Sequence, residues 1–107
     1  WNSFWFSVSL LPAMEKFKPE FILVSEGFDA HENDLLGQLK YSNNGYKEAT
    51  NILSTIAQKY ASNRMLFVLE GGYEPTNIRE ASESILNAII SKNQNWLADI
   101  RVFEYTT

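Results

Sequence analysis

The chain has 107 residues, a formal net charge of -4, one His and no Cys, and 45% of its residues are hydrophobic. That length allows one domain or a piece of a larger one, and the hydrophobic content is enough for a packed core. The lack of Cys excludes a disulfide scaffold, a thiolate zinc site and a cysteine nucleophile. The acidic balance argues against direct nucleic-acid binding, which needs clustered Lys and Arg.

A helix is predicted for residues 1–17, because apolar side chains recur there at helical spacing. Pro12 either bends this helix or begins a new one, and the Lys18-Pro19 pair ends it. The segment is too short to span a bilayer and lacks the basic start of a signal peptide, so no membrane partner is expected. Because the chain opens at Trp1 inside this pattern, we expect it to be a fragment. The apolar stripe comprises Phe4, Trp5, Val8, Leu11 and Met14.

Two short apolar runs, residues 21–24 and 65–69, predict strands that are buried on both faces, as in a parallel sheet. The polar connection over residues 25–42 is longer than a compact domain normally uses, and such loops are often functional. Helices are predicted for residues 43–60, with Ser42 as N-cap, and from residue 76 or 77 to 91. A short edge strand is predicted for residues 101–105. The inward positions of the last helix are Ile78, Ala81, Ile85, Leu86, Ile89 and Ile90.

The alternation of helices and strands is typical of an α/β domain with a doubly wound parallel sheet. Two strands do not make a stable sheet alone, so we expect most of the sheet to lie outside this chain. Ligands of such sheets bind beyond the carboxyl ends of the strands. Asp29 follows the first strand and Tyr73 follows the second, so both are predicted to face one crevice. There a carboxylate can hold a divalent metal, and a phenol can donate a hydrogen bond to an oxyanion.

The residues around Asp29 leave alternatives open. Asp29-Ala30-His31 is an Asp-x-His string, and in extended backbone both side chains would point the same way and could share a metal. His31 is interpreted instead as a loop histidine that hydrogen-bonds backbone or a nearby carboxylate. Asp34 could support the site from behind or be a solvated loop charge, and a structural role in the loop is favoured.

Two motifs resemble a known family. The stretch FKPEFILVSEGFDAHENDLLGQL, then Gly45-Tyr46 and FVLEGGY, is similar to the C-terminal part of the histone deacetylase and acetylpolyamine amidohydrolase family. The resemblance covers residues 4–90. It implies a three-layer α/β/α arginase-deacetylase fold with a parallel sheet, of which only the C-terminal portion is present. Residues 1–107 would then form the C-terminal part of the catalytic domain, without its upstream part.

The resemblance also implies a site. The aspartate of GFDAH is a ligand of the catalytic Zn²⁺ in the family and falls on Asp29, whereas His31 has no such role. The tyrosine of EGGY polarises the acetyl carbonyl and falls on Tyr73. Gly71, Gly72 and Leu36 would line the channel for the substrate, an acetyl-lysine side chain or an acetylated polyamine. The other zinc ligands and the histidine base lie upstream in the family, so the remainder of the catalytic domain is an expected partner and the fragment alone is expected to be inactive.

Three residues depart from the family pattern and bear on substrate preference and rate. Glu26 stands where Ala is common, Leu35 where Pro is usual, and Glu74 where Asn is common. Two other interpretations stay open: a non-catalytic, truncated relative that acts as an interaction module, and a stand-alone α/β domain without metal. An intracellular location, cytoplasmic or nuclear, is favoured.

Overall fold

The structure is a computed structural model that describes residues 6–37 and 39–92. The predicted strand over residues 101–105 and the first five residues of the predicted N-terminal helix lie outside the described residues. The elements, in chain order, are a π-helical turn η1 (Phe6–Leu10), α2 (Leu11–Phe17), β1 (Ile22–Glu26), α3 (Asn43–Tyr60), β2 (Met65–Leu69) and α4 (Pro75–Lys92). None of the helices in this described part is long and apolar enough to cross a membrane.

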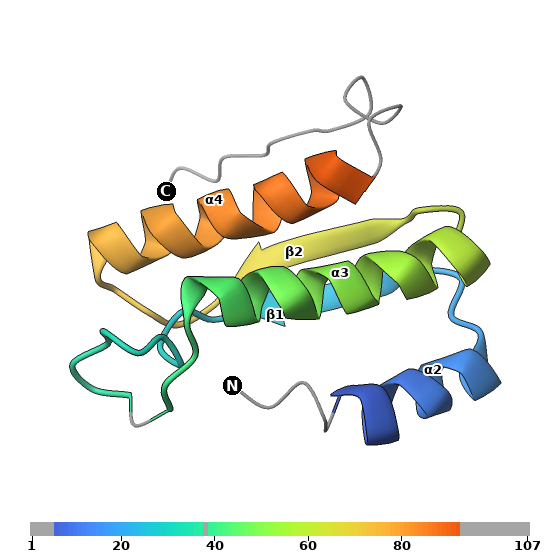
Figure 1. The fold of residues 1–107 in the computed structure, drawn as a ribbon, viewed down its shortest axis with the longest axis horizontal. Coiled ribbons are helices and arrows are strands. Elements are labelled where there is room, and N and C mark those ends of the chain that lie inside the picture. Colours follow the sequence, from blue (N-terminus) through green and yellow to red (C-terminus); the bar gives the residue numbers. More distant parts are fainter. Residues whose placement is uncertain (1–5, 38, 93–107) are drawn as a thin grey trace.

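The strands β1 and β2 form a parallel pair, and α3 is the helical crossover that connects them (Figure 1). Their register runs from Ile22 opposite Met65 to Glu26 opposite Leu69. The carbonyl of Arg64 fixes its start by accepting a hydrogen bond of 3.0 Å from the Ile22 amide. The predicted parallel sheet of an α/β fold is therefore confirmed.

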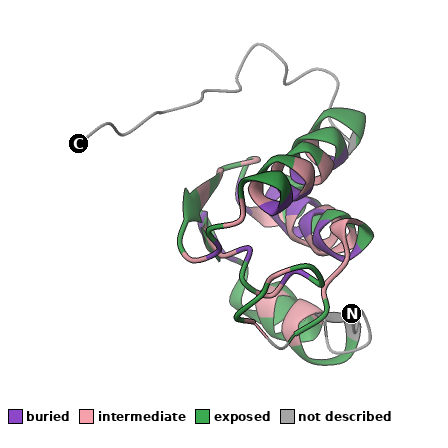
Figure 2. Ribbon diagram, turned by 90° about the vertical axis from the view of Figure 1, so that its left-hand side faces the viewer, coloured by how far each residue is buried: buried purple, intermediate pink, exposed green. Residues whose placement is uncertain are grey.

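The helices pack on one face of this sheet (Figure 2). One cluster joins β1 to α3 and α2, and a second joins the loop after β1 to α3 and α4. Burial of these apolar groups is the main favourable term in folding. The fully or nearly fully buried members are Ile22, Ile56, Ala57 and Ala61 in the first cluster, and Phe28, Tyr46, Ala81 and Ile85 in the second.

The prediction that both strands are buried on both faces is wrong for the described residues. Side chains alternate along β1, so Ile22 is buried while Leu23 is 70% exposed. On β2, Leu66 and Val68 are 42% and 46% exposed. The reason is that the described helices cover only one face, and a period of two sends alternate side chains to the other. Three predicted inward positions on helices, Val8, Leu86 and Ile90, are also exposed.

The helix ends follow their sequence signals. Ser42 caps α3 by accepting a hydrogen bond of 3.0 Å from the Gly45 amide, as predicted. Lys18 adopts a left-handed conformation, with φ of 56°, and ends α2 before Pro19. Pro12 lies in the first turn of α2, a position at which proline is common, and α2 follows directly on the π-helical turn η1.

Candidate active site

The site begins where the two strands end. The strand ladder continues past β1 and β2, since the Glu70 amide donates to the Glu26 carbonyl and the Phe28 amide donates to the Gly71 carbonyl, each at 2.9 Å. These bonds hold the two loops that follow the strands side by side. The loops carry Asp29 and Tyr73, so the predicted pairing of the two loops at one sheet edge is confirmed.

Glycines surround the carboxylate of Asp29. A methyl group placed on Gly71 would lie 2.6 Å from Oδ2, and one placed on Gly27 would lie 2.9 Å from Oδ1. Only a residue without a Cβ leaves the carboxylate where it is. Asp29 is exposed, and its carboxylate accepts no hydrogen bond from residues 6–37 or 39–92.

Tyr73 owes its position to Gly72. Gly72 has a φ of 95°, and a methyl group there would lie 2.7 to 2.8 Å from backbone atoms of Phe28 and Asp29. This close approach lets the second loop turn against the first. The Tyr73 side chain is 82% exposed.

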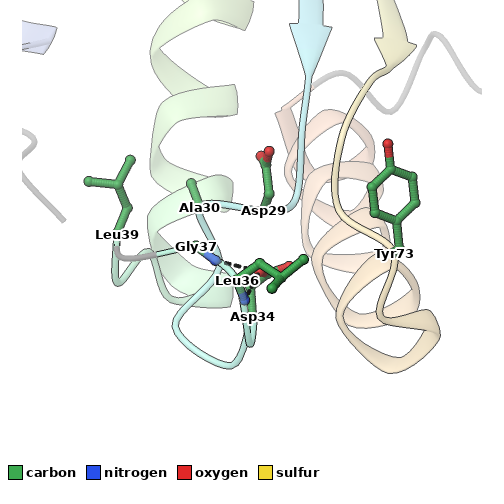
Figure 3. A pocket seen from close by; sticks show the side chains of 7 residues that line it. All are labelled: Asp29, Ala30, Asp34, Leu36, Gly37, Leu39 and Tyr73. Atoms are coloured by element: carbon green, nitrogen blue, oxygen red, sulfur yellow. Dashed lines mark hydrogen bonds between the residues drawn. The ribbon is translucent and has the colours of Figure 1, made fainter.

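Asp29 and Tyr73 line one pocket of about 340 Å³. In Figure 3 their side chains point the same way, from two adjacent loops. Leu36 also lines this pocket and is 88% exposed, and its part in a substrate channel stays a prediction. Gly71 and Gly72 do not line it; they contact Asp29 and the backbone beside it, so their place in a substrate channel stays a prediction. The lining that sequence reasoning missed consists of Ala30, Asp34, Gly37 and Leu39.

Asp34 shapes the pocket loop. Its Oδ1 accepts hydrogen bonds from the amides of Leu36, at 2.9 Å, and Gly37, at 2.7 Å (Figure 3). A methyl group on Gly37 would collide with the Asp29 carbonyl, so the loop folds back directly onto the residue that carries the carboxylate. The structural role predicted for Asp34 is confirmed, and the Asp-x-x-Gly spacing was the available signal for Gly37.

His31 is completely buried and faces away from this pocket toward α3. Its Nδ1 accepts a hydrogen bond of 3.1 Å from the Asn33 amide. The proton therefore resides on Nε2, which donates to Oδ1 of Asn43 at 2.7 Å. The interpretation of His31 as a loop histidine is confirmed.

Two groups beside the site have shifted acid strengths. Burial raises the pKa of Glu26 from 4.5 to about 7. Burial, and then the nearby negative charges of Glu26 and Asp29, raise the pKa of Tyr46 well above 10. Tyr46 therefore stays protonated, and its hydroxyl donates to the Gly27 carbonyl at 3.1 Å.

The donor set fits one ligand of a metal ion rather than a whole centre. An exposed carboxylate without a competing hydrogen bond, such as that of Asp29, is a suitable ligand for a divalent cation. Within the described ranges no group of three or more His, Cys, Asp or Glu side chains is arranged to hold a metal. A centre with three protein ligands would therefore need residues beyond these.

Comparison with known proteins identifies the family of this chain. The sequence pattern of the histone deacetylase domain matches residues 4–89. The chain belongs to the histone deacetylase domain family. It is 39% identical over 84 residues to type-2 histone deacetylase 2 of Dictyostelium discoideum, an alignment that covers 76% of this chain and 5% of that protein.

Other relatives agree with this family assignment. Histone deacetylase-like amidohydrolase of Pseudomonas aeruginosa is 36% identical over 64 residues, which cover 60% of this chain and 17% of that protein. The crystal structure of the HDA15 HD domain superimposes with a TM-score of 0.74 and 30% identity, over 84% of this chain and 24% of that chain. The chain thus spans less than a quarter of each of these relatives. The predicted family and its α/β fold are confirmed.

Proposed function

We propose that the protein containing this chain is a zinc-dependent amidohydrolase that removes acetyl groups from acetyl-lysine side chains or from acetylated polyamines. Residues 1–107 would form the C-terminal part of its catalytic domain. One observation carries the proposal: Asp29 and Tyr73 come from the ends of two paired strands and line the same pocket. Membership of the histone deacetylase domain family supports it.

Each residue has a part in the proposed reaction. Zinc, when bound, would polarise the acetyl carbonyl and lower the pKa of a water molecule to roughly 7. Asp29 would hold the ion as one of its ligands. The Tyr73 phenol would donate a hydrogen bond to the carbonyl oxygen as negative charge develops on it, a contribution of about 3 kcal/mol for a well-placed donor. Leu36 and Leu39 would form apolar walls that exclude water from the acyl chain.

The remaining zinc ligands and the base would come from the rest of the domain. The open sheet face supports this part of the proposal, because Leu23, Leu66 and Val68 lie exposed on it. A parallel sheet normally has helices on both faces, so these side chains would contact the upstream part of the domain. On this view the 107 residues alone are inactive.

The test uses the full-length protein with an acetyl-lysine peptide and an acetylated polyamine as substrates. Tyr73→Phe removes only the hydroxyl, so we expect unchanged zinc content and a loss of about 100- to 1000-fold in kcat. Asp29→Asn weakens a zinc ligand, so we expect a lower zinc content measured by atomic absorption. Tyr60→Phe, on the far end of α3, is the matched control for the loss of a phenol and should keep wild-type turnover. Wild-type turnover by Tyr73→Phe would refute the mechanism.

A further inference from the structure

Both chain segments that flank Asp29 are held by one face of α3. The Tyr46 hydroxyl donates to the carbonyl of Gly27, two residues before Asp29. Asn43 Oδ1 accepts the Nε2 proton of His31, two residues after Asp29. Asn43 and Tyr46 are three residues apart and so lie on the same side of the first turns of the helix. We call this pair, with His31 between them, the Asn43–Tyr46 clamp.

The clamp is buried and tightly packed. His31 is 0% exposed, and its ring stacks on Tyr46 with centroids 6.2 Å apart and planes 14° apart. Phe28, next to Asp29, packs against Tyr46 from another side, with centroids 5.4 Å apart. Because Phe28, His31 and Tyr46 are all buried, the loop cannot turn without breaking several contacts at once.

The clamp also reaches α4. The Asn43 side chain donates from Nδ2 to Oε2 of Glu80 at 3.2 Å. This bond orients the amide, because its nitrogen faces the carboxylate and its oxygen must then face His31. A chain of polar contacts therefore runs from the loop of Asp29 through α3 to α4, the helix that begins two residues after Tyr73.

We infer that Asn43, Tyr46 and His31 are positioning residues, which fix the direction of the Asp29 carboxylate for a metal ion from behind the loop. The inference rests on the proposed function for its metal, but it concerns contacts within this chain alone. Groups that orient a metal ligand typically change metal affinity by 10- to 100-fold when they are removed. None of the three needs to touch the metal or the substrate.

The experiment measures Zn²⁺ affinity of the full-length protein by competition with a chelator, together with the visible spectrum of the Co²⁺-loaded form. Tyr46→Phe keeps the ring and removes the bond to Gly27, and we expect a loss of about tenfold in affinity and an altered Co²⁺ spectrum. Asn43→Ala leaves the buried His31 donor without its partner, and we expect a similar or larger loss. Tyr60→Phe and Asn44→Ala, in the same helix but outside the clamp, are the matched controls and should bind as the wild type does.

Exchanging the amide and the carboxylate between positions 43 and 80 tests whether the hydrogen bonds of the clamp, rather than the stability of the fold alone, set the metal affinity. Asn43→Asp keeps an acceptor for His31 but places a carboxylate against Glu80, so affinity should fall. Adding Glu80→Gln supplies a donor to the new carboxylate, and the double variant should recover most of the wild-type affinity and spectrum. This pair also keeps the test decisive if Tyr46→Phe or Asn43→Ala does not fold.

The outcomes distinguish failure of the proposed function from failure of the clamp. A wild-type protein that binds no Zn²⁺ would overturn the proposed function, and the clamp with it. A wild-type protein that binds Zn²⁺, with clamp variants that melt earlier but retain its affinity and Co²⁺ spectrum, would overturn the clamp and leave the proposed function standing. A double variant that stays as weak as Asn43→Asp would also count against the clamp.

Discussion

Gly71→Ala tests how Asp29, the proposed metal ligand, is held. A methyl group at this position would lie 2.6 Å from Oδ2 of Asp29 and 3.1 Å from Cγ, whereas ordinary contacts begin near 3.4 Å. The carboxylate must therefore move by about 0.8 Å to make room. Protein ligands hold metals to within about 0.2 Å of fixed distances, so a displacement of this size should disrupt coordination.

The same displacement should cost the fold little. The crowded atoms belong to the end of an exposed side chain, which can rotate at a cost of about 0.5–1.5 kcal/mol. Replacing glycine with alanine also lowers the conformational entropy of the unfolded chain. This stabilises the folded state by about 0.4–1 kcal/mol where φ is not left-handed, as at Gly71. We expect the free energy of unfolding of the full-length protein, measured in chelator, to change by less than about 1 kcal/mol.

The assay compares zinc affinity with stability in the same protein. Gly71→Ala should bind Zn²⁺ at least about tenfold more weakly while its thermal melt stays close to that of the wild type. Gly72→Ala provides the contrast, because its methyl group would meet rigid backbone at a φ of 95° and should destabilise the fold by about 2 kcal/mol or more. If Gly71→Ala bound Zn²⁺ as tightly as the wild type, the absence of a side chain at this position would not be what allows the Asp29 carboxylate to bind metal.

Two further predictions concern stability. The raised pKa of Glu26 means that the folded state binds the proton of this carboxyl group more tightly than the unfolded state does. The resulting contribution to the free energy of unfolding is fully present below pH 4.5 and is lost as the pH rises through about 7. Glu26→Gln should accordingly match the wild type in urea unfolding at pH 4 and be more stable at pH 8, by about 1 kcal/mol once partial solvent screening is allowed for; an equal difference at both pH values would contradict the assignment. Ile56 is 0% exposed, so Ile56→Ala should destabilise the protein by about 3 kcal/mol in the same assay and leave zinc affinity unchanged.

The secondary structure was largely predictable because its signals are local. The strand over residues 65–69 and the helix over residues 43–60 match the observed β2 and α3 in their bounds. Ser42 marks a helix start through its side-chain oxygen, and Pro19 marks a helix end by restricting the residue before it, whatever lies around them. Parallel pairing followed from the alternation of elements, since two parallel strands need a long crossover between them.

Burial was less predictable because it depends on partners rather than on the residue. A continuous apolar run such as residues 21–24 indicates two covered faces, but the described helices supply only one, so Leu23 lies exposed. Leu86 and Ile90 each follow directly on a residue of the inward stripe, Ile85 and Ile89, and are themselves four residues apart. Their spacing does not tell the inner edge of an apolar stripe from its outer edge. In both cases the sequence pattern reports what a residue is suited to contact, and the structure reports what is there.

In the candidate site, too, the residues with local sequence signals were predictable and those that depend on tertiary contacts were not. Strand ends and motifs placed Asp29 and Tyr73 at one sheet edge, as the structure has them, and His31 is the hydrogen-bonded loop histidine that was predicted. Asn43 and Glu80 were not found, because a polar residue in the first turn of a helix and a charged residue within one both have ordinary explanations on the surface. Their role emerges only when α3 and α4 lie together and Asn43 contacts both His31 and Glu80.

The two principal side chains of the site are held very differently. The Asp29 carboxylate lies between two glycines, and its backbone neighbours are tied to α3 on both sides. Tyr73 is 82% exposed, and its hydroxyl makes no hydrogen bond within the described ranges. A metal ligand benefits from a fixed direction before the ion arrives, because coordination tolerates little displacement. A phenol that stabilises an oxyanion must instead be aimed at an atom of the substrate, so its final direction would depend on the substrate and on the rest of the domain. On the proposed function, this chain would supply a metal ligand held in a fixed direction and a phenol whose final orientation depends on contacts with the substrate and the rest of the domain.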